Sequence, residues 1–341
     1  MSKQGEMILM IYTGFLISAL ITVIAAVKLS TYADVIGERT RLGGMLAGTL
    51  LLAGATSLPE VTTSLTAVVV ENPDIAVSNV LGSNLFNLMI LASFDVFYRR
   101  NRMFRHVGSD HQLTAWIGLF MTAVIALGMM SPMSIEWFNI GIEMFLMMVI
   151  YVAGIITLSK KEFTEPLMQQ STSIESVYHK KAISLKEAKV GFLIASVITL
   201  IAGSFLTLTG DAIAIATNMS SSFMGTFLIA AATSLPEVVA VLVAVQLANY
   251  ALAVGNILGS NMFNLLILAL VDFFVRDQAV LQAVHPVTIL TVITVFLLNS
   301  IVLFALYKAK ALSVDGKCYS LPSAVLVLLY FISSYFIFTL S

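Results

Sequence analysis

The chain has 341 residues, of which 59% are hydrophobic and only 11% are charged, with a mean hydropathy of +0.96 and a formal net charge of −1. Soluble domains carry about a quarter charged residues, so this composition excludes a soluble domain. It predicts an all-α polytopic membrane protein that contacts the lipid bilayer and no nucleic acid. The single cysteine, Cys318, excludes a disulfide framework and a cysteine-based metal cluster.

Apolar runs of roughly 20 residues, long enough to cross a bilayer, recur along the whole sequence. The first run has no small-residue cleavage site behind it, so it is expected to be a helix and not a removed signal peptide. Ten transmembrane helices are predicted, at about residues 7–28, 43–70, 74–97, 112–131, 135–159, 188–210, 222–247, 250–275, 284–307 and 321–340. A polar stretch after the fifth helix divides the chain into a first five-helix half (1–159), a cytoplasmic connecting loop (160–187) and a second five-helix half (188–341).

Lysine and arginine positions predict how these helices are oriented in the membrane. If the N-terminus lies outside, 16 of the 18 basic residues fall in inner loops, and only Lys3 and Arg276 fall outside. The 16 inner residues are Lys28, Arg39, Arg41, Arg99, Arg100, Arg102, Arg105, Lys160, Lys161, Lys180, Lys181, Lys186, Lys189, Lys308, Lys310 and Lys317. Both termini are therefore expected outside, and so compact a chain fits a prokaryotic inner membrane best.

Two segments of the first half return in the second half, 177 residues later. GATSLPEVTTSL at 54–65 matches AATSLPEVVAVL at 231–242, and NVLGSNLFNLMILA at 79–92 matches NILGSNMFNLLILA at 256–269. Because each half has an odd number of helices, the second half enters the membrane from the opposite side. The sequence therefore predicts inverted repeats, an arrangement in which transporters bind substrate near the midplane on interrupted helices.

Pro59 and Pro236 interrupt the second and seventh predicted helices at matching positions. A proline leaves a carbonyl of the preceding turn without its donor, which a bilayer tolerates only where protein or a lined cavity satisfies it. Freed carbonyls and neighbouring hydroxyls would form a set of oxygen ligands, the hydroxyls being those of Thr56, Ser57, Thr233 and Ser234. The alternative is a simple proline kink with hydroxyl back-bonding, and the symmetric second copy argues against it.

Glu60 and Glu237 follow these prolines directly. An ionised carboxylate in the middle of a bilayer costs at least ~2.5–3.5 kcal/mol, and no Lys, Arg or His lies in the middle of a span to pair with either acid. Oxygen ligands suit hard cations such as Ca²⁺, Mg²⁺ or Na⁺, whereas the absence of nearby His and Cys argues against zinc or copper. The alternative is a protonated glutamate that donates a packing hydrogen bond.

A serine and two asparagines share one face of the third and of the eighth predicted helix. They are Ser83, Asn84 and Asn87 in the first half and Ser260, Asn261 and Asn264 in the second. An amide can ligate an ion without adding charge, and hydrogen bonding between helices is the alternative, above all for Asn84 and Asn261. Near the ends of these helices, Asp95 and Asp272 are expected at the membrane interface, paired with Arg99 and Arg276 rather than with an ion.

Paired TSLPE and GSNxFN segments in inverted repeats resemble the alpha repeats of the calcium/cation antiporter superfamily, and most closely those of sodium/calcium exchangers. The resemblance is sharp over Ala53–Ala92 and Ala230–Ala269 and extends over nearly the whole chain through the helix count. It implies that Ca²⁺ and Na⁺ are bound by Glu60, Glu237, Thr56, Ser57, Thr233, Ser234, Ser83, Ser260, Asn87, Asn264 and the backbone carbonyls of Ala53 and Ala230.

Two details refine this resemblance. Some microbial members and the potassium-dependent exchangers have aspartate where this chain has Asn264, so potassium dependence is less expected here. The cation/proton branch usually carries GNxxE where this chain has TSLPE, so the chain resembles that branch less.

The charge count suggests how such a site would work. An empty site with both glutamates ionised holds about −2, a charge that is unfavourable to move through an apolar barrier. One Ca²⁺, or two or more Na⁺, would neutralise it, so the loaded site would switch sides readily and the empty site poorly. This is the behaviour of an exchanger and not of a channel.

We therefore expect a secondary active antiporter that exchanges Na⁺ for Ca²⁺ by alternating access, with no enzymatic activity and no cofactor. A Ca²⁺/H⁺ or K⁺-linked antiporter on the same fold is the alternative, because repulsion between the two carboxylates could leave one of them protonated. An intramembrane aspartyl-type protease is disfavoured, because the paired acids are glutamates beside prolines.

Overall fold

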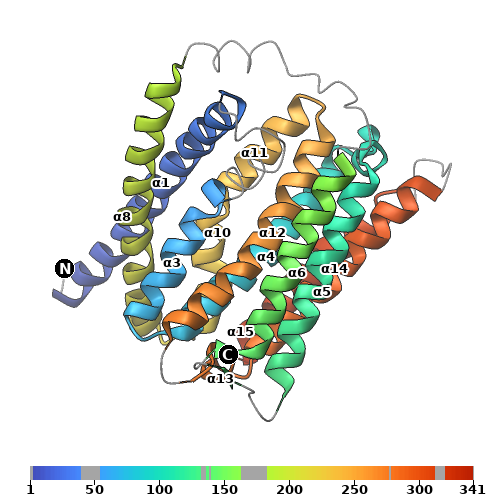
Figure 1. Ribbon diagram of the computed structural model, residues 1–341. Coiled ribbons are helices and arrows are strands. Elements are labelled where there is room, and N and C mark those ends of the chain that lie inside the picture. The colour runs from blue at the N-terminus through green and yellow to red at the C-terminus, as the bar shows by residue number, and fades with distance from the viewer. Residues whose placement is uncertain are drawn as a thin grey trace.

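A computed structural model describes residues 3–39, 54–131, 136–137, 140–162, 183–275, 278–311 and 319–340. Most of these residues lie in helices that form one bundle (Figure 1). The long helices are α1 (Lys3–Arg39), α4 (Pro73–Phe97), α5 (Ser109–Met130), α6 (Ile142–Glu162), α8 (Leu185–Thr217), α12 (Tyr250–Phe274), α14 (Thr288–Ala311) and α15 (Leu321–Leu340). The shorter elements are α3 (Leu58–Val69), η1 (Arg99–Asn101), η2 (Met103–His106), β1 (Glu136–Trp137), β2 (Ile140–Gly141), α9 (Ser221–Phe223), η3 (Met224–Ile229), α10 (Ala230–Thr233), α11 (Leu235–Gln246) and α13 (Val280–Ala283).

Seven of the described helices are long and apolar enough to cross a membrane, and an eighth span results if the bent pair 221–233 and 235–246 counts as one. In α6 the apolar part is shorter, Ile142–Leu158, and the second predicted span is described only from residue 54 onward. The prediction of a helical polytopic membrane protein is confirmed. The count of ten spans and the inverted relation of the two halves remain predictions.

α1 and α8 are longer than the spans predicted for them, with 37 and 33 residues. α8 begins at a capping box formed by Ser184 and Glu187, and it ends at Asn218, whose backbone is left-handed with φ of 53°. The prediction ended this helix at residue 210 because the apolar run ends there. A helix ends where a capping signal stops it, which is why α8 continues to Thr217.

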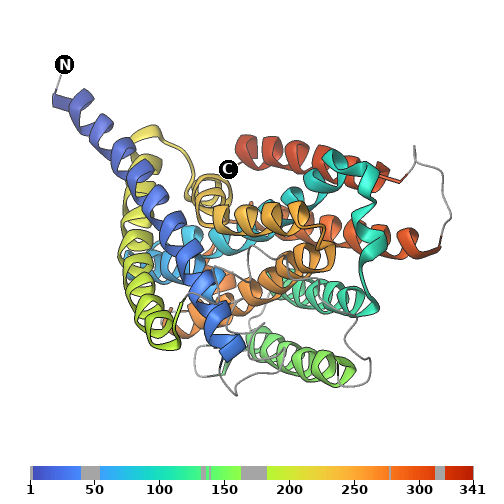
Figure 2. The same ribbon diagram turned by 90° about the horizontal axis from the view of Figure 1, so that it is seen from above.

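α4 and α12 lie at the centre of the bundle. In their most apolar stretches, 89% of α4 and 67% of α12 is buried, compared with 17% for α1 and 28% for α15. The outer helices expose large apolar side chains such as Leu16, Leu193 and Phe331, which is the surface that a bilayer would cover. α1 and α8 lie side by side along one edge of the bundle (Figure 2), and α8 packs against α3.

The helices that carry the TSLPE segments are interrupted within the motif in both halves. Ser57 and Ser234 separate the preceding turn from α3 and α11, and the second break bends the path by 45°. Pro59 and Pro236 stand in the first turn of the new helix, where the missing amide proton would have no intrahelical partner anyway. The interruption that the prolines predict is therefore present at both positions.

A π-helix, η3, runs directly into α10 and packs against α4. A Cβ atom on Gly82 would overlap the backbone of Thr226, and a Cβ atom on Gly225 would overlap the side chain of Ser78. Glycine at these two positions therefore lets the helices approach more closely than any other residue would allow. This contact fixes the start of the second broken helix against the centre of the bundle.

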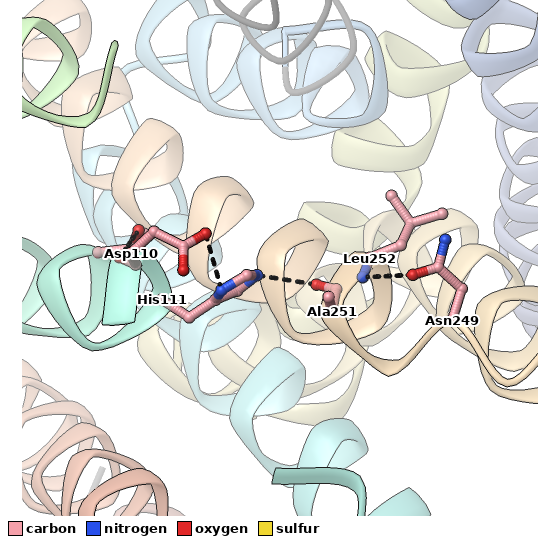
Figure 3. Close-up of polar contacts among 6 residues, drawn as sticks. Asp110, His111, Asn249, Ala251 and Leu252 are labelled. Atoms are coloured by element: carbon pink, nitrogen blue, oxygen red, sulfur yellow. Dashed lines mark hydrogen bonds and ion pairs between the residues drawn. The ribbon is translucent and has the colours of Figure 1, made fainter. Parts of the chain in front are cut away.

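Polar contacts link the connections at one end of the bundle. Asn101 Nδ2 donates to Tyr250 Oη at 2.8 Å, which joins η1 to the start of α12. His111 lies between Asp110, whose Oδ2 is 3.1 Å from Nδ1, and the Ala251 carbonyl, which accepts from Nε2 at 2.9 Å (Figure 3). The N-termini of α5 and α12 therefore meet at the end of the bundle that carries the arginines of η1 and η2.

Acidic side chains mark the opposite end. Asn72 Nδ2 donates to Asp211 Oδ1 at 2.7 Å, which joins the turn before α4 to α8. Asp74 Oδ1 accepts from the His285 amide at 2.6 Å and from Ser222 Oγ at 3.2 Å. The arginines of η1 and η2 thus lie at one end of the central helices, and Asp74 and Asp211 lie at the other.

Candidate ion-binding site

Glu60 and Glu237 each occupy the first turn of a helix, α3 and α11 respectively, and both side chains are fully buried. The first turn of a helix presents amide groups without intrahelical partners and the positive end of the helix dipole, which both favour a carboxylate. The break before each helix therefore brings an acid to a helix N-terminus in both halves. Ser234, which directly precedes α11, donates to Glu60 Oε1 at 3.3 Å, so the two acids share one buried region.

The Glu60 carboxylate is held by hydroxyls from both halves of the chain. Its Oε1 accepts from Ser83 Oγ on α4 at 3.4 Å and from Ser234 Oγ, just before α11, at 3.3 Å. Its Oε2 is buried without a hydrogen-bond partner. Glu60 is therefore only partly satisfied by the protein.

The Glu237 carboxylate is less well satisfied. The hydroxyls of Thr56 and Ser260 lie beside it, 3.5 Å from each other. Neither of its oxygens makes a hydrogen bond of ordinary geometry. A matching pair, Ser83 and Thr233, lies with its hydroxyl oxygens 3.4 Å apart. Four of the six predicted hydroxyl ligands thus form pairs between the two halves.

The predicted amide ligands lie where α4 and α12 cross. Asn87 Nδ2 donates to Asn261 Oδ1 at 3.0 Å, and Asn264 Nδ2 donates to Asn84 Oδ1 at 3.1 Å. Oδ1 of Asn87 and Oδ1 of Asn264 are buried without partners. Asn84 and Asn261 therefore make the helix-to-helix hydrogen bonds that were the alternative to ion ligation, whereas Asn87 and Asn264 keep an oxygen free.

Six buried oxygens on the predicted ligands lack a hydrogen-bond partner. They are Ser57 Oγ, Glu60 Oε2, Glu237 Oε1, Glu237 Oε2, Asn87 Oδ1 and Asn264 Oδ1. A buried polar atom without a partner lowers the stability of the fold by about 1–3 kcal/mol. This region is therefore suited to a ligand that several oxygen atoms can bind at once, as they bind a hard cation. No cluster of three or more His, Cys, Asp or Glu that could hold a metal occurs in the described residues, so these oxygens belong to two acids and otherwise neutral groups.

The two predicted carbonyl ligands have different outcomes. Ala53 lies outside the described residues. Ala230 is fully buried, and its carbonyl accepts from Thr233 Oγ1 at 3.2 Å and from the Ser234 amide at 3.0 Å. A ligand role for Ala230 stays a prediction, and an ion there would share the oxygen with these donors.

Asn79 is a buried residue next to the site that sequence reasoning did not select. Its Nδ2 donates to Thr63 Oγ1 at 2.7 Å and to Ser64 Oγ at 3.1 Å, and its Oδ1 accepts from Thr233 Oγ1 at 3.4 Å. It therefore connects α3 with α10 across α4. The available signal was its match with Asn256 at the first position of the repeated segment.

Asp95 and Asp272 differ from the expectation of residues at the membrane interface, whereas the pairing of Asp272 with Arg276 stays a prediction because Arg276 lies outside the described residues. Both are fully buried. Asp95 accepts from Tyr319 Oη at 3.1 Å and from Ser323 Oγ at 2.6 Å. Asp272 accepts from the backbone amides of Gly141, at 2.8 Å, and of Val280. Burial explains the difference, because a carboxylate away from water needs short hydrogen bonds.

Similar proteins agree with a membrane transporter. "Inner membrane protein YrbG" of Escherichia coli (strain K12) is 26% identical over 264 residues, which cover 76% of this chain and 78% of that protein. "Putative antiporter CaxA" of Alkalimonas amylolytica is 25% identical over 269 residues, which cover 76% of this chain and 79% of that protein.

Solved structures of ion exchangers share the fold. The H⁺/Ca²⁺ exchanger CAX superposes with a TM-score of 0.72 at 14% identity, over 100% of this chain and 93% of that one. The sodium-calcium exchanger NCX_Mj superposes with a TM-score of 0.61 at 17% identity, over 96% of this chain and 98% of that one. At such low identity the likeness concerns the fold and not the choice of ions.

The family model described as "Sodium/calcium exchanger protein" matches residues 10–157 and 188–339. The two matched segments contain both TSLPE segments and both GSNxFN segments. Together they make up most of the chain, and the protein therefore belongs to the sodium/calcium exchanger family of membrane antiporters, within the calcium/cation antiporter superfamily.

Proposed function

We propose that the protein is a secondary active antiporter that exchanges Na⁺ for Ca²⁺ across a membrane, with the ions bound between Glu60 and Glu237. The observation that carries this proposal is the set of six buried oxygens without partners on the predicted ligands. A hard cation would satisfy several of them at once. The family, and the similar exchangers that act on calcium, support calcium antiport.

The proposed ligand set combines two charges with neutral oxygens. It comprises Glu60, Glu237, Thr56, Ser57, Thr233, Ser234, Ser83, Ser260, Asn87, Asn264 and the carbonyls of Ala53 and Ala230. One Ca²⁺, or two or more Na⁺, balances the two carboxylates. Because an unbalanced buried charge is costly, the loaded site changes sides and the empty site does not, which is the basis of alternating access.

Exchange of Ca²⁺ for H⁺ is the second candidate. It is favoured by one observation, namely that neither oxygen of the buried Glu237 carboxylate makes a hydrogen bond of ordinary geometry. A proton shared by the two acids would remove the repulsion between their charges. In this case the same glutamates would carry protons in place of Na⁺.

We also infer the arrangement of the chain in its membrane. The two halves, 1–159 and 188–341, would be inverted repeats joined by a cytoplasmic loop, with both termini outside. The gathering of arginines in η1 and η2 at one end of the bundle supports this orientation. Similarity to a bacterial inner membrane protein supports a prokaryotic inner membrane.

Transport of ⁴⁵Ca²⁺ into proteoliposomes tests the ion coupling. Vesicles loaded with Na⁺ are expected to take up Ca²⁺, whereas vesicles loaded with K⁺ are not. Acid-loaded vesicles without Na⁺ provide the second control. Uptake that a proton gradient drives equally well without Na⁺ would replace the sodium-coupled proposal by Ca²⁺/H⁺ exchange.

Removal of either proposed ligand charge tests the site. Glu60→Gln and Glu237→Gln are each expected to reduce uptake to the level of empty liposomes, because one carboxylate cannot balance Ca²⁺. Glu6→Gln is the matched control, since Glu6 is exposed at the start of α1 and should leave uptake unchanged. Uptake retained in a correctly inserted Glu60 or Glu237 variant would remove that residue from the site.

A further inference from the structure

Four asparagines interlock at the crossing of α4 and α12. Asn84 Nδ2 donates to the Asn261 carbonyl at 3.1 Å, and Asn261 Nδ2 donates to the Asn84 carbonyl at 3.3 Å. Their Oδ1 atoms accept from Asn264 and from Asn87, respectively. Asn84 and Asn261 thus use both ends of their amides, and each is bonded only to the other half of the chain in this cluster.

These hydrogen bonds determine which way every amide in the cluster points. A backbone carbonyl can only accept, so the groups of Asn84 and Asn261 that face these carbonyls must be the NH₂ groups. Their oxygens must then face Asn264 and Asn87. Those two residues must in turn present their NH₂ groups, because two amide oxygens at 3.0–3.1 Å would repel each other. The orientation therefore follows from the network and not from an arbitrary choice of amide flip.

The remaining oxygens, Asn87 Oδ1 and Asn264 Oδ1, are buried and have no partner. Asn87 lies one helical turn beyond Ser83, so both stand on the same face of α4. Ser83 Oγ is 3.4 Å from Glu60 Oε1. The free amide oxygens therefore belong to residues on the helix faces that also carry Ser83 and Ser260.

We propose that Asn84 and Asn261 are positioning residues that hold the amides of Asn264 and Asn87 with their oxygens, and not their NH₂ groups, turned toward the bound cation. This inference rests on the function proposed above. An NH₂ group turned into the site would repel a cation. The hydrogen bonds from Asn87 and Asn264 to the other two asparagines therefore leave a neutral amide oxygen, and not an NH₂ group, at each of these two positions. The positioning acts between the two halves, since Asn84 of the first half holds Asn264 and Asn261 of the second half holds Asn87.

Variants at Asn84 and Asn264 test the proposal by their effect on Ca²⁺ affinity. The affinity is measured as the Ca²⁺ concentration that half-maximally raises the melting temperature of the purified protein in detergent, and the melting temperature without Ca²⁺ reports folding. Asn84→Ala frees the amide of Asn264 and is expected to weaken Ca²⁺ binding about tenfold. Asn261→Ala should act in the same way through Asn87, and it serves if Asn84→Ala does not fold.

The matched control is Asn299→Ala. Asn299 is a buried asparagine on α14 whose Nδ2 donates to the Ala115 carbonyl at 3.3 Å. Its loss removes a comparable bond between helices, so it should lower the melting temperature and leave Ca²⁺ affinity unchanged. If Asn84→Ala and Asn261→Ala behave like this control, these residues only join the two helices and the proposal is wrong.

A double-mutant cycle identifies the route of the effect. In an Asn264→Ala background, Asn84→Ala should cause little further loss of affinity, because the amide that it orients is already gone. In an Asn87→Ala background it should cause the full tenfold loss. Equal losses in the two backgrounds would overturn the positioning role. If Ca²⁺ neither raises the melting temperature of the wild-type protein nor is transported by it, the proposed function itself is contradicted.

Discussion

Glu60 and Glu237 occupy matching positions but have different surroundings. Glu60 accepts two hydrogen bonds from serine hydroxyls, at 3.3 and 3.4 Å, whereas Glu237 accepts none of ordinary geometry. A buried acid without donors depends more strongly on a cation or a proton for its stability. Within this pair, hydrogen bonds therefore satisfy the Glu60 carboxylate in part and the Glu237 carboxylate less.

This difference predicts an unequal effect of neutralising the two acids on the ion-free protein. Glu237→Gln should raise the melting temperature in the absence of Ca²⁺ and Na⁺ by about 2 °C or more, because it removes a buried carboxylate whose oxygens make no hydrogen bond of ordinary geometry. Glu60→Gln should raise it less, since it also disturbs the bonds from Ser83 and Ser234. The measurement is thermal unfolding in detergent with chelator. An equal or larger rise of the melting temperature in Glu60→Gln would show that the hydrogen bonds from Ser83 and Ser234 do not stabilise the ion-free protein.

At the scale of helices, two aspartates tie the central helices to outer elements. Asp95 near the end of α4 binds hydroxyls at the start of α15, and Asp272 near the end of α12 binds backbone amides before α6 and in α13. Each aspartate therefore joins a central helix of one half to the start of the last long helix of the other half. The helices that carry Asn87 and Asn264 are fixed at their ends by these contacts.

Loss of the Asp95 contact should destabilise the bundle. A hydrogen bond to a charged group contributes about 1.5–3 kcal/mol, and Asp95→Ala removes two of them from a buried site. We expect a melting temperature lower by about 5 °C or more. Asp110→Ala is the control, because the Asp110 side chain is 43% exposed and its pairing with His111 should contribute little. A similar decrease of the melting temperature in the two variants would contradict the proposal that Asp95 stabilises the contact between α4 and α15.

The two halves also differ in how the helix after each break is held. In the first half, Thr63 and Ser64 on α3 bond to Asn79, and Thr207 on α8 donates to the Thr63 carbonyl at 3.2 Å. The matching positions on α11 are Ala240 and Val241. Hydrogen bonds therefore hold α3, whereas apolar contacts hold α11, although the acids that they carry are equivalent.

At the scale of the whole molecule, the arginines of η1 and η2 gather at one end of the bundle. In Figure 1 the N-terminal end of α1 lies at the left edge of the bundle, and the C-terminal end of α15 lies toward the bottom. The arginine-bearing elements η1 and η2 join the ends of the central helices to Tyr250 and Tyr319, through bonds of 2.8 Å each. If this arginine-bearing end faces the cytoplasm, the basic residues obey the rule that they accumulate inside.

The single cysteine tests this orientation. Cys318 lies in the loop between the ninth and tenth predicted spans, which is expected inside. A membrane-impermeant maleimide should therefore label it in inverted vesicles and not in right-side-out vesicles. A cysteine in place of Lys3, in a Cys318→Ser background, is the control and should show the reverse pattern. Labelling of Cys318 in right-side-out vesicles would reverse the proposed topology.

The sequence by itself determined the membrane class, most helix positions and the family. Long apolar runs, a proline before an acid and a repeat at 177 residues are local signals, and each has a direct physical cost or benefit that can be judged without neighbours. The same signals selected Glu60, Glu237, Asn87 and Asn264, which lie on the elements that meet at the centre of the bundle.

Only the tertiary structure decided which partners these residues have. The bonds of Asn84 with Asn261, of Glu60 with Ser234 and of Asp95 with Ser323 join residues more than 170 positions apart. A side chain's hydrogen-bond partner depends on how the helices cross, and no local pattern encodes that crossing. For the same reason the sequence named Asn84 as a polar residue, and the crossing of α4 and α12 made it the residue that orients an amide of the other half.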